Sequence, residues 1–424
     1  MKNFKFDVDY FRNQFPAMRN TVNGYPAVYM DGPGGTQVPQ RVMDEMKEHM
    51  TMHNANIHGI FKTTLENDAI IINARKTFAE FFNCDWEEVC FGENTTTNNF
   101  KLAMGFARML EEGDEILITE IDHEGNRSPW LMLEDFGAVV KNVRLKPDVV
   151  ELDFDDFKSK LSDKTKIVAI NWAANSCGTI TDVKKYIEEA HKVGAIVVVD
   201  AVQYAPHGVI DVKEIDADIL HTSPYKYYGP HCGAFYCRKE LGAKIKSARV
   251  MADDNTEMPF KLETGTMCME NSSGAAEAIE FIADIGRRHA EMFEDETAGL
   301  EGKRKDIVCG MRAMDTYEAQ LAAKMRDGIR DIPGLKLYGP SEGTPQTATV
   351  SFTVEGMNAN DIAKKLADLG IFVWDGEFYA IETIWNVLKL QPYGGMVRIG
   401  LAPSLLESDV ARTIAAVRQI CGVA

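Results

Sequence analysis

Residues 195–226 read AIVVVDAVQYAPHGVIDVKEIDADILHTSPYK, and this stretch decides the class of fold. Its two largely apolar runs, AIVVVD and ADILHT, are short, which is typical of strands buried on both faces of a sheet. Each run ends in polar residues: Asp200 and Gln203 follow the first, and Ser223, Tyr225 and Lys226 follow the second. Because ligand sites in open α/β sheets lie at the carboxyl ends of the strands, these side chains are candidates for one site.

The same alternation of strands and helices extends in both directions along the chain. EEVCFG, EILITE, VVKNVRL and KIVAINWAA upstream, and GAFYCRK downstream, are predicted strands separated by amphipathic stretches. This pattern predicts an α/β fold whose large domain holds a mainly parallel sheet covered on both faces. Near the C-terminus, long helical stretches mix with TATVSFTVEG and MVRIGLAP, which predicts a smaller α+β domain. We expect the large domain at residues 21–285 and the small domain at residues 286–424 together with residues 1–20.

Composition narrows the classes of partner. The 424 residues carry 46 Lys and Arg against 64 Asp and Glu, and the net charge of −18 repels nucleic acids and anionic membranes. No stretch approaches the ~18 consecutive apolar residues of a membrane helix, and the N-terminal MKNFKFDVDYFRNQF lacks the apolar run of a signal peptide. The eight cysteines lack the spacing of a disulfide framework or a zinc site. We therefore expect a cytoplasmic protein with no metal, nucleic-acid or membrane partner.

Two of the candidate residues have positions that need a chemical explanation. Lys226 stands between aromatic residues and a Gly-Pro turn, directly after a buried strand. A desolvated amine in such a place has a lowered pKa and can attack an aldehyde. Asp200 ends an apolar strand, where an unpaired carboxylate would be unfavourable. It either caps a turn or keeps a pyridine nitrogen protonated, as in enzymes that use pyridoxal 5′-phosphate.

A phosphate group would suit the residues that follow the strand EEVCFG. The sequence NTTT at residues 94–97 places the hydroxyls of Thr95 and Thr96 at a helix N-terminus, where backbone amides bind anions. Three threonines exceed what a helix cap requires, and Ser223 adds a hydroxyl near the lysine. His123 follows the strand EILITE, in a position to stack on a flat ring and to relay protons near neutral pH.

Taken together, these segments resemble the class V aminotransferases, and most closely their cysteine desulfurase and selenocysteine lyase branch. The resemblance extends from YMDGPGG at residues 29–35 to MVRIGLAP at residues 396–403. It implies the aspartate aminotransferase-like fold of type I, with a seven-stranded sheet, and pyridoxal 5′-phosphate as the cofactor. Lys226 would then form the Schiff base with the cofactor. The other contacts that the resemblance implies are His123 on the ring, Asp200 on the ring nitrogen, Gln203 on the phenolic oxygen, and Thr95, Thr96, Ser223 and Tyr225 around the phosphate.

The resemblance also implies a homodimer and an amino acid substrate. In the family, a glycine-threonine segment of the partner subunit completes the phosphate site, and Thr266 in LETGTMCMEN occupies that place. Asn175 in AANSCG would lie over the cofactor, near the substrate. Arg398 in MVRIGLAP matches the arginine that grips the substrate's α-carboxylate with its planar fork.

One segment departs from the desulfurase pattern. In desulfurases, a mobile loop of the small domain carries a cysteine that takes the substrate's sulfur as a persulfide. The matching stretch here is VWDGEFYAIET, where Tyr379 stands in the place of that cysteine, and no cysteine lies between Cys309 and Cys421. A phenol forms no persulfide. Cys177 and Cys268 fall in segments near the predicted pocket, so a displaced nucleophile stays open.

Three functions remain open on this sequence. The first is a lyase or desulfurase-type cleavage of a C–S or C–Se bond without the persulfide cysteine, in which Lys226 removes the α-proton and Tyr379 orients the substrate or donates a proton. The second is epimerisation or transamination on the same fold, with His123 or Tyr379 as a second acid. The third is an inactive scaffold in sulfur trafficking. The catalytic residues expected for an enzyme are Lys226, His123 and Tyr379.

Overall fold

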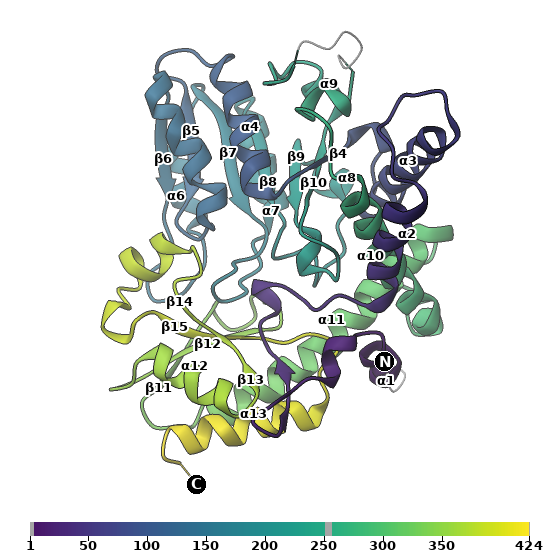
Figure 1. The fold of residues 1–424 in the computed structure, drawn as a ribbon. Helices are drawn as coiled ribbons and strands as arrows, with labels where there is room; N and C mark the ends of the chain where they lie inside the picture. Colours follow the sequence, from purple (N-terminus) through teal and green to yellow (C-terminus); the bar gives the residue numbers. More distant parts are fainter. Residues whose placement is uncertain (1–3, 251–256, 424) are drawn as a thin grey trace.

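The computed structural model describes residues 4–250 and 257–423, and its largest element is a seven-stranded sheet in the order β4-β10-β9-β8-β7-β5-β6 (Figure 1). Its neighbours from β9 to β6 pair in parallel, whereas β10 runs antiparallel to both β9 and β4. The expected α/β fold with a mainly parallel sheet is confirmed. The strands are β4 Val89–Gly92, β5 Glu115–Thr119, β6 Val139–Val143, β7 Thr165–Asn171, β8 Ile196–Asp200, β9 Ile219–Thr222 and β10 Gly233–Cys237.

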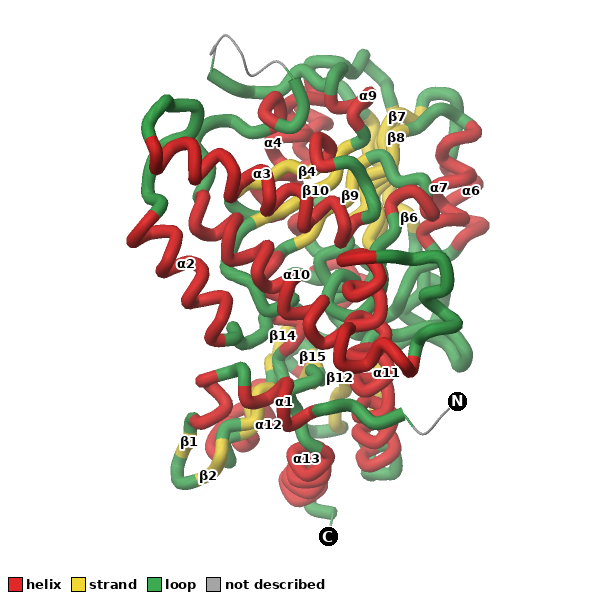
Figure 2. Tube along the Cα trace, turned by 90° about the vertical axis from the view of Figure 1, so that its right-hand side faces the viewer, coloured by secondary structure: helices red, strands yellow, loops and turns green. Residues whose placement is uncertain are grey.

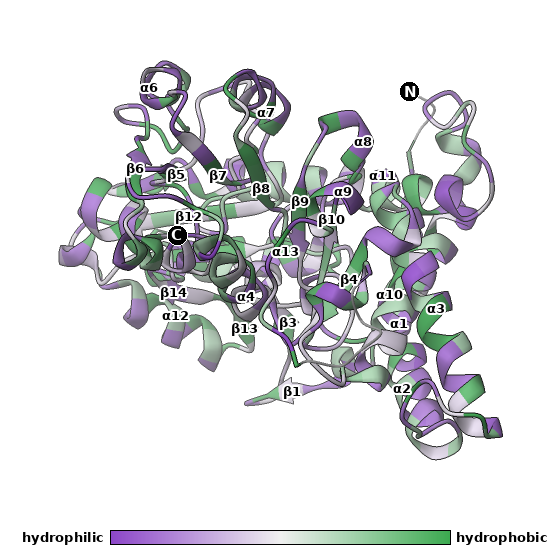
Figure 3. Cartoon of the chain, turned by 90° about the horizontal axis from the view of Figure 1, so that it is seen from above, coloured by the Kyte–Doolittle hydropathy of each residue, from purple (hydrophilic) through white to green (hydrophobic). Residues whose placement is uncertain are grey.

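Hydrophobic cores cover both faces of this sheet. Successive residues of β5 illustrate the arrangement, because Ile116 and Ile118 join one buried cluster and Leu117 joins the other. Phe106 of helix α4 (Thr95–Ala107) packs in the first cluster, and Ile187 of helix α7 (Val183–Lys192) packs in the second. In Figure 3, hydrophobic residues concentrate on strands such as β8, whereas peripheral helices such as α7 mix hydrophobic and hydrophilic residues. Burial on both faces explains why these strands appear in the sequence as nearly continuous apolar runs.

A second, four-stranded sheet lies below the first in Figure 1, in the order β11-β12-β15-β14, with every pair antiparallel. Its strands are β11 Leu335–Tyr338, β12 Thr349–Val354, β14 Trp374–Gly376 and β15 Met396–Gly400. The short strand β3 Val28–Tyr29 pairs in parallel with β13 Ile371–Phe372, and Asp31 forms a β-bridge with Gly400. An N-terminal segment therefore joins the C-terminal part of the chain. The domain boundaries at residues 21–285 and 286–424 with 1–20 stay a prediction.

The helices surround both sheets, and α11 extends from the large sheet to the small one (Figure 1). The stretch 126–137 forms a short helix followed by a 3-10 turn at Met132–Phe136. No helix of the described residues is long and apolar enough to cross a membrane. The helices are α1 Val8–Asn13, α2 Gln40–Met52, α3 Lys62–Phe82, α4 Thr95–Ala107, α5 Ser128–Leu131, α6 Phe154–Lys160, α7 Val183–Lys192, α8 Val212–Ile215, α9 Lys239–Gly242, α10 Met269–His289, α11 Gly302–Ile329, α12 Ala359–Asp368 and α13 Glu407–Ile420; the remaining strands are β1 Thr21–Val22 and β2 Tyr25–Pro26.

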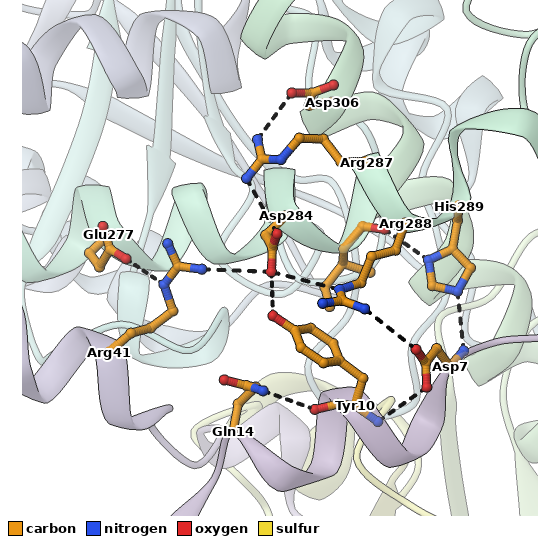
Figure 4. A network of polar contacts seen from close by, with 11 residues as sticks. Asp7, Tyr10, Gln14, Arg41, Glu277, Asp284, Arg287, Arg288, His289 and Asp306 are labelled. Atoms are coloured by element: carbon orange, nitrogen blue, oxygen red, sulfur yellow. Dashed lines mark hydrogen bonds and ion pairs between the residues drawn. The ribbon is translucent and has the colours of Figure 1, made fainter.

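The N-terminal helix α1 lies against α10 and reaches the C-terminal helix (Figure 2). Asp284 of α10 accepts a hydrogen bond from the Tyr10 hydroxyl at 2.5 Å, and the Arg288 guanidinium lies 3.2 Å from the centre of the Tyr10 ring (Figure 4). Arg12, two residues further along α1, pairs with Asp409 of α13 at 2.9 Å. Helix α1 therefore connects the part of the chain that carries the large sheet with the part that carries the small one.

A buried ion pair anchors the segment that precedes α10. Arg75 of α3 donates to both carboxylate oxygens of Glu263 at 2.9 and 2.8 Å, and to the carbonyl of Val89 at 2.7 Å. Glu263 also accepts from the amide of Phe91 at 2.8 Å. The guanidinium lies 5.2 Å from the ring centres of Phe91 and Phe260. This pair holds the LETGT segment, which contains Thr266, against the edge of the large sheet.

Replacing Glu263 by Gln is expected to lower the free energy of unfolding by about 3–5 kcal/mol, because the Arg75 guanidinium would lose its buried counter-charge. Urea denaturation followed by circular dichroism measures the change. The matched control is Glu189→Gln, which removes the exposed ion pair with Lys192 and should change the free energy by no more than about 1 kcal/mol. Equal effects of the two substitutions would contradict the anchoring role of Arg75.

Candidate active site

Two adjoining cavities open at the carboxyl ends of β5, β7, β8 and β9. The inner cavity has a volume of about 150 Å³ and the outer one about 650 Å³, and they share lining residues that include His123, Asn175 and Lys226. The inner cavity also collects the side chains predicted to bind a cofactor: Thr95, Thr96, Asp200, Gln203, Ser223 and Tyr225. Tyr379 and Arg398 line the outer cavity. The fold thus brings together residues that are separated by up to some three hundred positions in the sequence.

Lys226 lies at the bottom of both cavities, in the 3-10 turn Pro224–Lys226 that follows β9. Its side chain is buried, and Nζ donates a hydrogen bond to Oε1 of Gln203 at 3.3 Å. Burial, together with the nearby positive charge of Arg398, lowers the pKa of Lys226 to about 8, against the opposing effects of Asp200 and Asp31. A substantial fraction of this amine is therefore neutral, and nucleophilic, near physiological pH.

Asp200 ends β8 and faces the inner cavity. One carboxylate oxygen accepts a hydrogen bond from the amide of Val202 at 2.9 Å. Burial raises the pKa of Asp200, whereas the Lys226 ammonium opposes this shift. A carboxylate in this setting gains stability from a cationic donor such as a protonated ring nitrogen. The two interpretations of Asp200 from the sequence are compatible, because the carboxylate that faces the cavity also caps the turn at Val202.

His123 presents a neutral imidazole to both cavities. Its Nδ1 accepts a hydrogen bond from the amide of Gly125 at 2.9 Å, so the proton of the neutral ring is on Nε2. Burial lowers the pKa of His123 to about 3, with smaller contributions from the positive charges of Lys226 and Arg398. The ring is consequently suited to stacking on a flat group rather than to carrying a charge.

The N-terminus of α4 provides an anion site at one end of the inner cavity. Asn94 caps the helix by accepting from the amide of Thr97 at 2.8 Å, and the hydroxyls of Thr95 and Ser223 lie 2.8 Å apart. Gly233 permits this packing, because a Cβ there would lie 2.7 Å from the backbone carbon of Asn94. Hydroxyls and free helix amides at one point form the donor set that phosphate groups require.

This donor set fits pyridoxal 5′-phosphate. An anion site, a buried amine, a buried carboxyl and a neutral imidazole line a single cavity. Two buried amide oxygens on the same wall, Oδ1 of Asn171 and Oδ1 of Asn175, have no hydrogen-bond partner among the described residues. Polar atoms left in this state are expected where a ligand supplies the missing partner.

Arg398 of β15 is a buried guanidinium on the wall of the outer cavity. It donates to the carbonyl of Asn175 at 3.0 Å and to the carboxylate of Asp31 at 3.0 Å, and it lies 4.2 Å from the centre of the Phe378 ring. Its Nε has no hydrogen-bond partner within the described residues. The guanidinium is held in one orientation and keeps a donor for a carboxylate.

The turn that carries Tyr379 is fixed to the wall of the site. Phe378 and Tyr379 both adopt left-handed backbone conformations, with φ of 57° and 56°, which non-glycine residues rarely adopt. Nδ2 of Asn175 donates to the carbonyl of Phe378 at 2.7 Å, and the amide of Glu124 donates to the carbonyl of Tyr379 at 2.8 Å. The Tyr379 ring lies 5.4 Å from that of His123. Both hydrogen bonds connect the turn to loops of the large sheet.

Three residues predicted near the site do not line the cavities. Thr266 is exposed in the segment before α10, and its predicted role in a partner subunit's site stays a prediction. Cys177 is buried with its Sγ 3.5 Å from the hydroxyl of Thr179, and burial raises its pKa. Cys268 is exposed at the start of α10. No cysteine of the described residues lines either cavity.

Sequence reasoning missed several residues of the site. Asp31, the partner of Arg398, lies in the YMDGPGG motif, so its position in that motif was the available signal. Asn171 ends β7 just as Asp200 ends β8, and the rule of carboxyl ends could have identified it. The aromatic residues of the outer cavity, Phe100, Trp374 and Phe378, had no local signal, because their contacts depend on how the two sheets meet.

The fold is that of the cysteine desulfurases. The apo structure of a cysteine desulfurase from Thermococcus onnurineus NA1 superimposes with a TM-score of 0.84 at 24% identity and covers 100% of both chains. The cysteine desulfurase CsdA from Escherichia coli gives a TM-score of 0.80 at 24% identity over 98% of both chains. At this level of identity the likeness concerns the fold alone, and it confirms the expected fold type I architecture.

The chain belongs to the class-V aminotransferase family, whose model matches residues 28–304 and 306–413. A probable cysteine desulfurase of Halalkalibacterium halodurans is 32% identical over 382 residues, which cover 86% of this chain and 87% of the relative. The aminotransferase-like protein FGM3 of Gibberella zeae is 28% identical over 436 residues, which cover 99% of this chain and 100% of the relative. These matches confirm the resemblance to the cysteine desulfurase-like branch.

Replacement of Lys226 by Met is expected to stabilise the cofactor-free protein in a pH-dependent way. The pKa of Lys226 is about 8 in the fold, whereas lysine in an unfolded chain titrates near ~10.4. Between these values the unfolded chain binds more protons, so the stability of the wild type rises with pH and is lowest below the folded pKa. The variant should gain about 1–3 kcal/mol near neutral pH, and the gain should shrink towards the pKa of an unfolded lysine.

Urea denaturation of cofactor-free protein at a series of pH values measures this difference. Lys184→Met, at an exposed position of α7, is the control and should show no pH-dependent gain. A gain for Lys226→Met that is the same at every pH would indicate improved packing, and would contradict the lowered pKa of the amine.

Proposed function

We propose that this chain is a pyridoxal 5′-phosphate-dependent enzyme that cleaves the C–S or C–Se bond of an amino acid without a persulfide cysteine. The observation that carries this proposal is the fixed turn with Tyr379 beside a buried lysine, in cavities that no cysteine of the described residues lines. A thiol that accepts sulfur has to travel to the substrate, and this turn offers neither a thiol nor freedom to move. Elimination needs no such acceptor.

The residues of the inner cavity have separate roles in holding the cofactor. Pyridoxal 5′-phosphate, when bound, supplies an electron sink for the bonds at the α-carbon of an amino acid. Asp200 would keep the ring nitrogen protonated, and the His123 imidazole would stack on the ring. Gln203 would contact the phenolic oxygen of the cofactor. In the structure, Oε1 of Gln203 accepts a hydrogen bond from Nζ of Lys226 at 3.3 Å. The phosphate would be held by Thr95, Thr96, Ser223 and Tyr225, with Thr266 from the partner subunit.

The substrate is held by its carboxylate. Arg398 has an unpartnered Nε, and Asn175 and Asp31 fix the orientation of its guanidinium. With the carboxylate bound there, the α-carbon lies between Arg398 and the amine of Lys226. The neutral form of Lys226, which its pKa of about 8 makes accessible near neutral pH, takes the α-proton at Nζ. Tyr379 lines the same cavity, and its hydroxyl would give a proton to the departing group.

Two features of this proposal concern the whole protein. The exposed position of Thr266 supports a homodimer in which each subunit completes the other's phosphate site. A cytoplasmic location follows from the proposed chemistry together with the eight free cysteines, of which the buried ones are packed among apolar residues.

Transamination is the second candidate function. The likeness over nearly the whole chain to a relative described as aminotransferase-like favours it, and the outer cavity has room for a keto acid. Epimerisation would use the same first proton transfer, with Tyr379 or His123 returning the proton on the opposite face. An inactive scaffold would not require the cavity's combination of Lys226, Asp200 and Arg398.

Product analysis on holoenzyme with L-cysteine tests the proposal. Wild type should release pyruvate, ammonia and sulfide in equal amounts, without alanine. Lys226→Ala should lower turnover by at least ~10³-fold, and Tyr379→Phe by roughly 10–100-fold, because each removes a proton-transfer group. Conversion of Tyr379 to Cys should not produce alanine, since its turn is fixed by hydrogen bonds to Asn175 and Glu124.

Other products would identify the other functions. Alanine in wild type would show that a cysteine accepts sulfur after all, and that elimination is wrong. A keto acid formed only with a second amino acid product would indicate transamination, and a D-amino acid would indicate epimerisation. If Lys226→Ala does not change the turnover, or if the wild type turns over no amino acid, the inactive scaffold is the function that remains.

A further inference from the structure

The outer cavity is far larger than a cysteine side chain requires. Its volume of about 650 Å³ lies within the ~300–1,000 Å³ that is typical of sites for drug-sized ligands. The side chain of L-cysteine ends at a single sulfur atom one bond beyond the β-carbon. A cavity of this size has room for a substituent larger than that sulfur.

The wall of this outer space is aromatic. Phe100 comes from α4, Trp374 from β14, and Tyr379 from the fixed turn, and all three line the cavity. Their exposed fractions are 36%, 55% and 65%, which are high for large aromatic side chains. Aromatic rings exposed around one cavity mark a site for an apolar ligand or partner.

Trp374 is well placed to contact a substrate that Arg398 holds. The two residues are directly opposite each other in the antiparallel pair of β14 and β15. Side chains at opposite positions point to the same face of a sheet, with Cβ atoms about 4.5–5.5 Å apart. The aromatic wall therefore begins next to the residue that binds the carboxylate.

The charged groups on this wall are already paired. Glu124 forms an ion pair with Arg127 at 3.3 Å and accepts a hydrogen bond from Ser128 at 2.9 Å. Arg398 is paired with Asp31, and burial keeps His123 neutral with a pKa of about 3. Among the described lining residues, only Lys226 lacks an ionic partner at bonding distance, and its amine has a role in the reaction. Apart from Lys226, the described residues of this wall therefore offer no unpaired charge to the end of a substrate's side chain.

From these observations, and on the basis of the C–S cleavage proposed above, we infer that the substrate is a cysteine thioether whose sulfur carries a flat, uncharged aromatic group. The group R of R–S–CH2–CH(NH3+)–COO− would lie between Phe100, Trp374 and Tyr379. A sulfur that already has a substituent leaves as the thiol R–SH. No protein thiol is then needed to receive it, which agrees with tyrosine at position 379.

The reaction is an elimination followed by hydrolysis. Lys226 removes the α-proton, the Cβ–S bond breaks with its electron pair going to sulfur, and a proton from Tyr379 completes R–SH. The remaining 2-aminoacrylate takes up water and gives pyruvate and ammonium. The balance is R–S–CH2–CH(NH3+)–COO− plus H2O to R–SH, pyruvate and NH4+, with no external oxidant or reductant.

The test compares S-benzyl-, S-methyl- and S-carboxymethyl-L-cysteine with L-cysteine on the holoenzyme. Pyruvate is measured with lactate dehydrogenase and the released thiol with a thiol reagent. The value of kcat/KM for the S-benzyl compound should exceed that for the S-methyl compound by at least ~10-fold, because the ring is buried against aromatic side chains. The S-carboxymethyl compound should be the poorest thioether. Calorimetric titration of cofactor-free protein should show the same order of binding without turnover.

The variant Trp374→Ala tests whether the preference for the S-benzyl compound arises at the aromatic wall. It should lower the S-benzyl to S-methyl ratio of kcat/KM by roughly 5–20-fold, since it removes one face of the ring's binding site. The matched control is Phe136→Ala, another exposed aromatic residue, which lies before β6 at the opposite end of the strands and should leave the ratio unchanged. The oligomeric state of each variant is measured by light scattering.

Equal kcat/KM for the S-benzyl and S-methyl compounds would overturn the inference while leaving C–S cleavage intact. A Trp374→Ala variant that dissociates into monomers with an unchanged ratio would also overturn it, because the rings would then serve a subunit contact. If neither L-cysteine nor any thioether yields pyruvate, the proposed C–S cleavage itself fails.

Discussion

The buried guanidinium of Arg398 is the interaction on which the geometry of the site depends. A charge in this position is tolerated only if hydrogen bonds and a counter-charge compensate its desolvation. Asp31 supplies the charge from the N-terminal segment, and Asn175 supplies a carbonyl from the end of the large sheet. Three distant parts of the chain are thereby held at one point. The residues around Asp31 are held in place as well, because β3 pairs with β13 and Asp31 itself forms a β-bridge with Gly400 of β15.

Lys226 depends on this arrangement. Its amine is desolvated because loops from both sheets enclose it, and the positive charge of Arg398 acts on it in the same direction. The negative charge of Asp200 raises the pKa of Lys226 against both effects, although its carboxylate is not within hydrogen-bond distance of the amine. The balance leaves the pKa of Lys226 at about 8, where both protonation states are accessible. Such a balance suits an amine to act as a nucleophile or as a base.

Much of the inner cavity could be predicted from the sequence, because its residues follow strands whose apolar runs are unmistakable. Asp200 and Lys226 end two such strands, and the parallel sheet brings these ends to one edge. The outer cavity could not be predicted in this way. Phe100 and Trp374 line one cavity only because the small sheet docks below the large one, and no local pattern encodes that docking. The buried pair of Arg75 and Glu263 was equally hidden, since both resemble ordinary surface charges in the sequence.

The conformation of the turn at Phe378 and Tyr379 determines the shape of the outer cavity. A residue that receives sulfur must approach the substrate and then withdraw, which requires a mobile segment. Two successive left-handed residues are instead retained by hydrogen bonds from Asn175 and Glu124. Such strain persists only where the surroundings determine the conformation. The fixed turn places Phe378 on Arg398 and Tyr379 beside His123, so this segment acts as a wall that defines the space beyond the α-carbon.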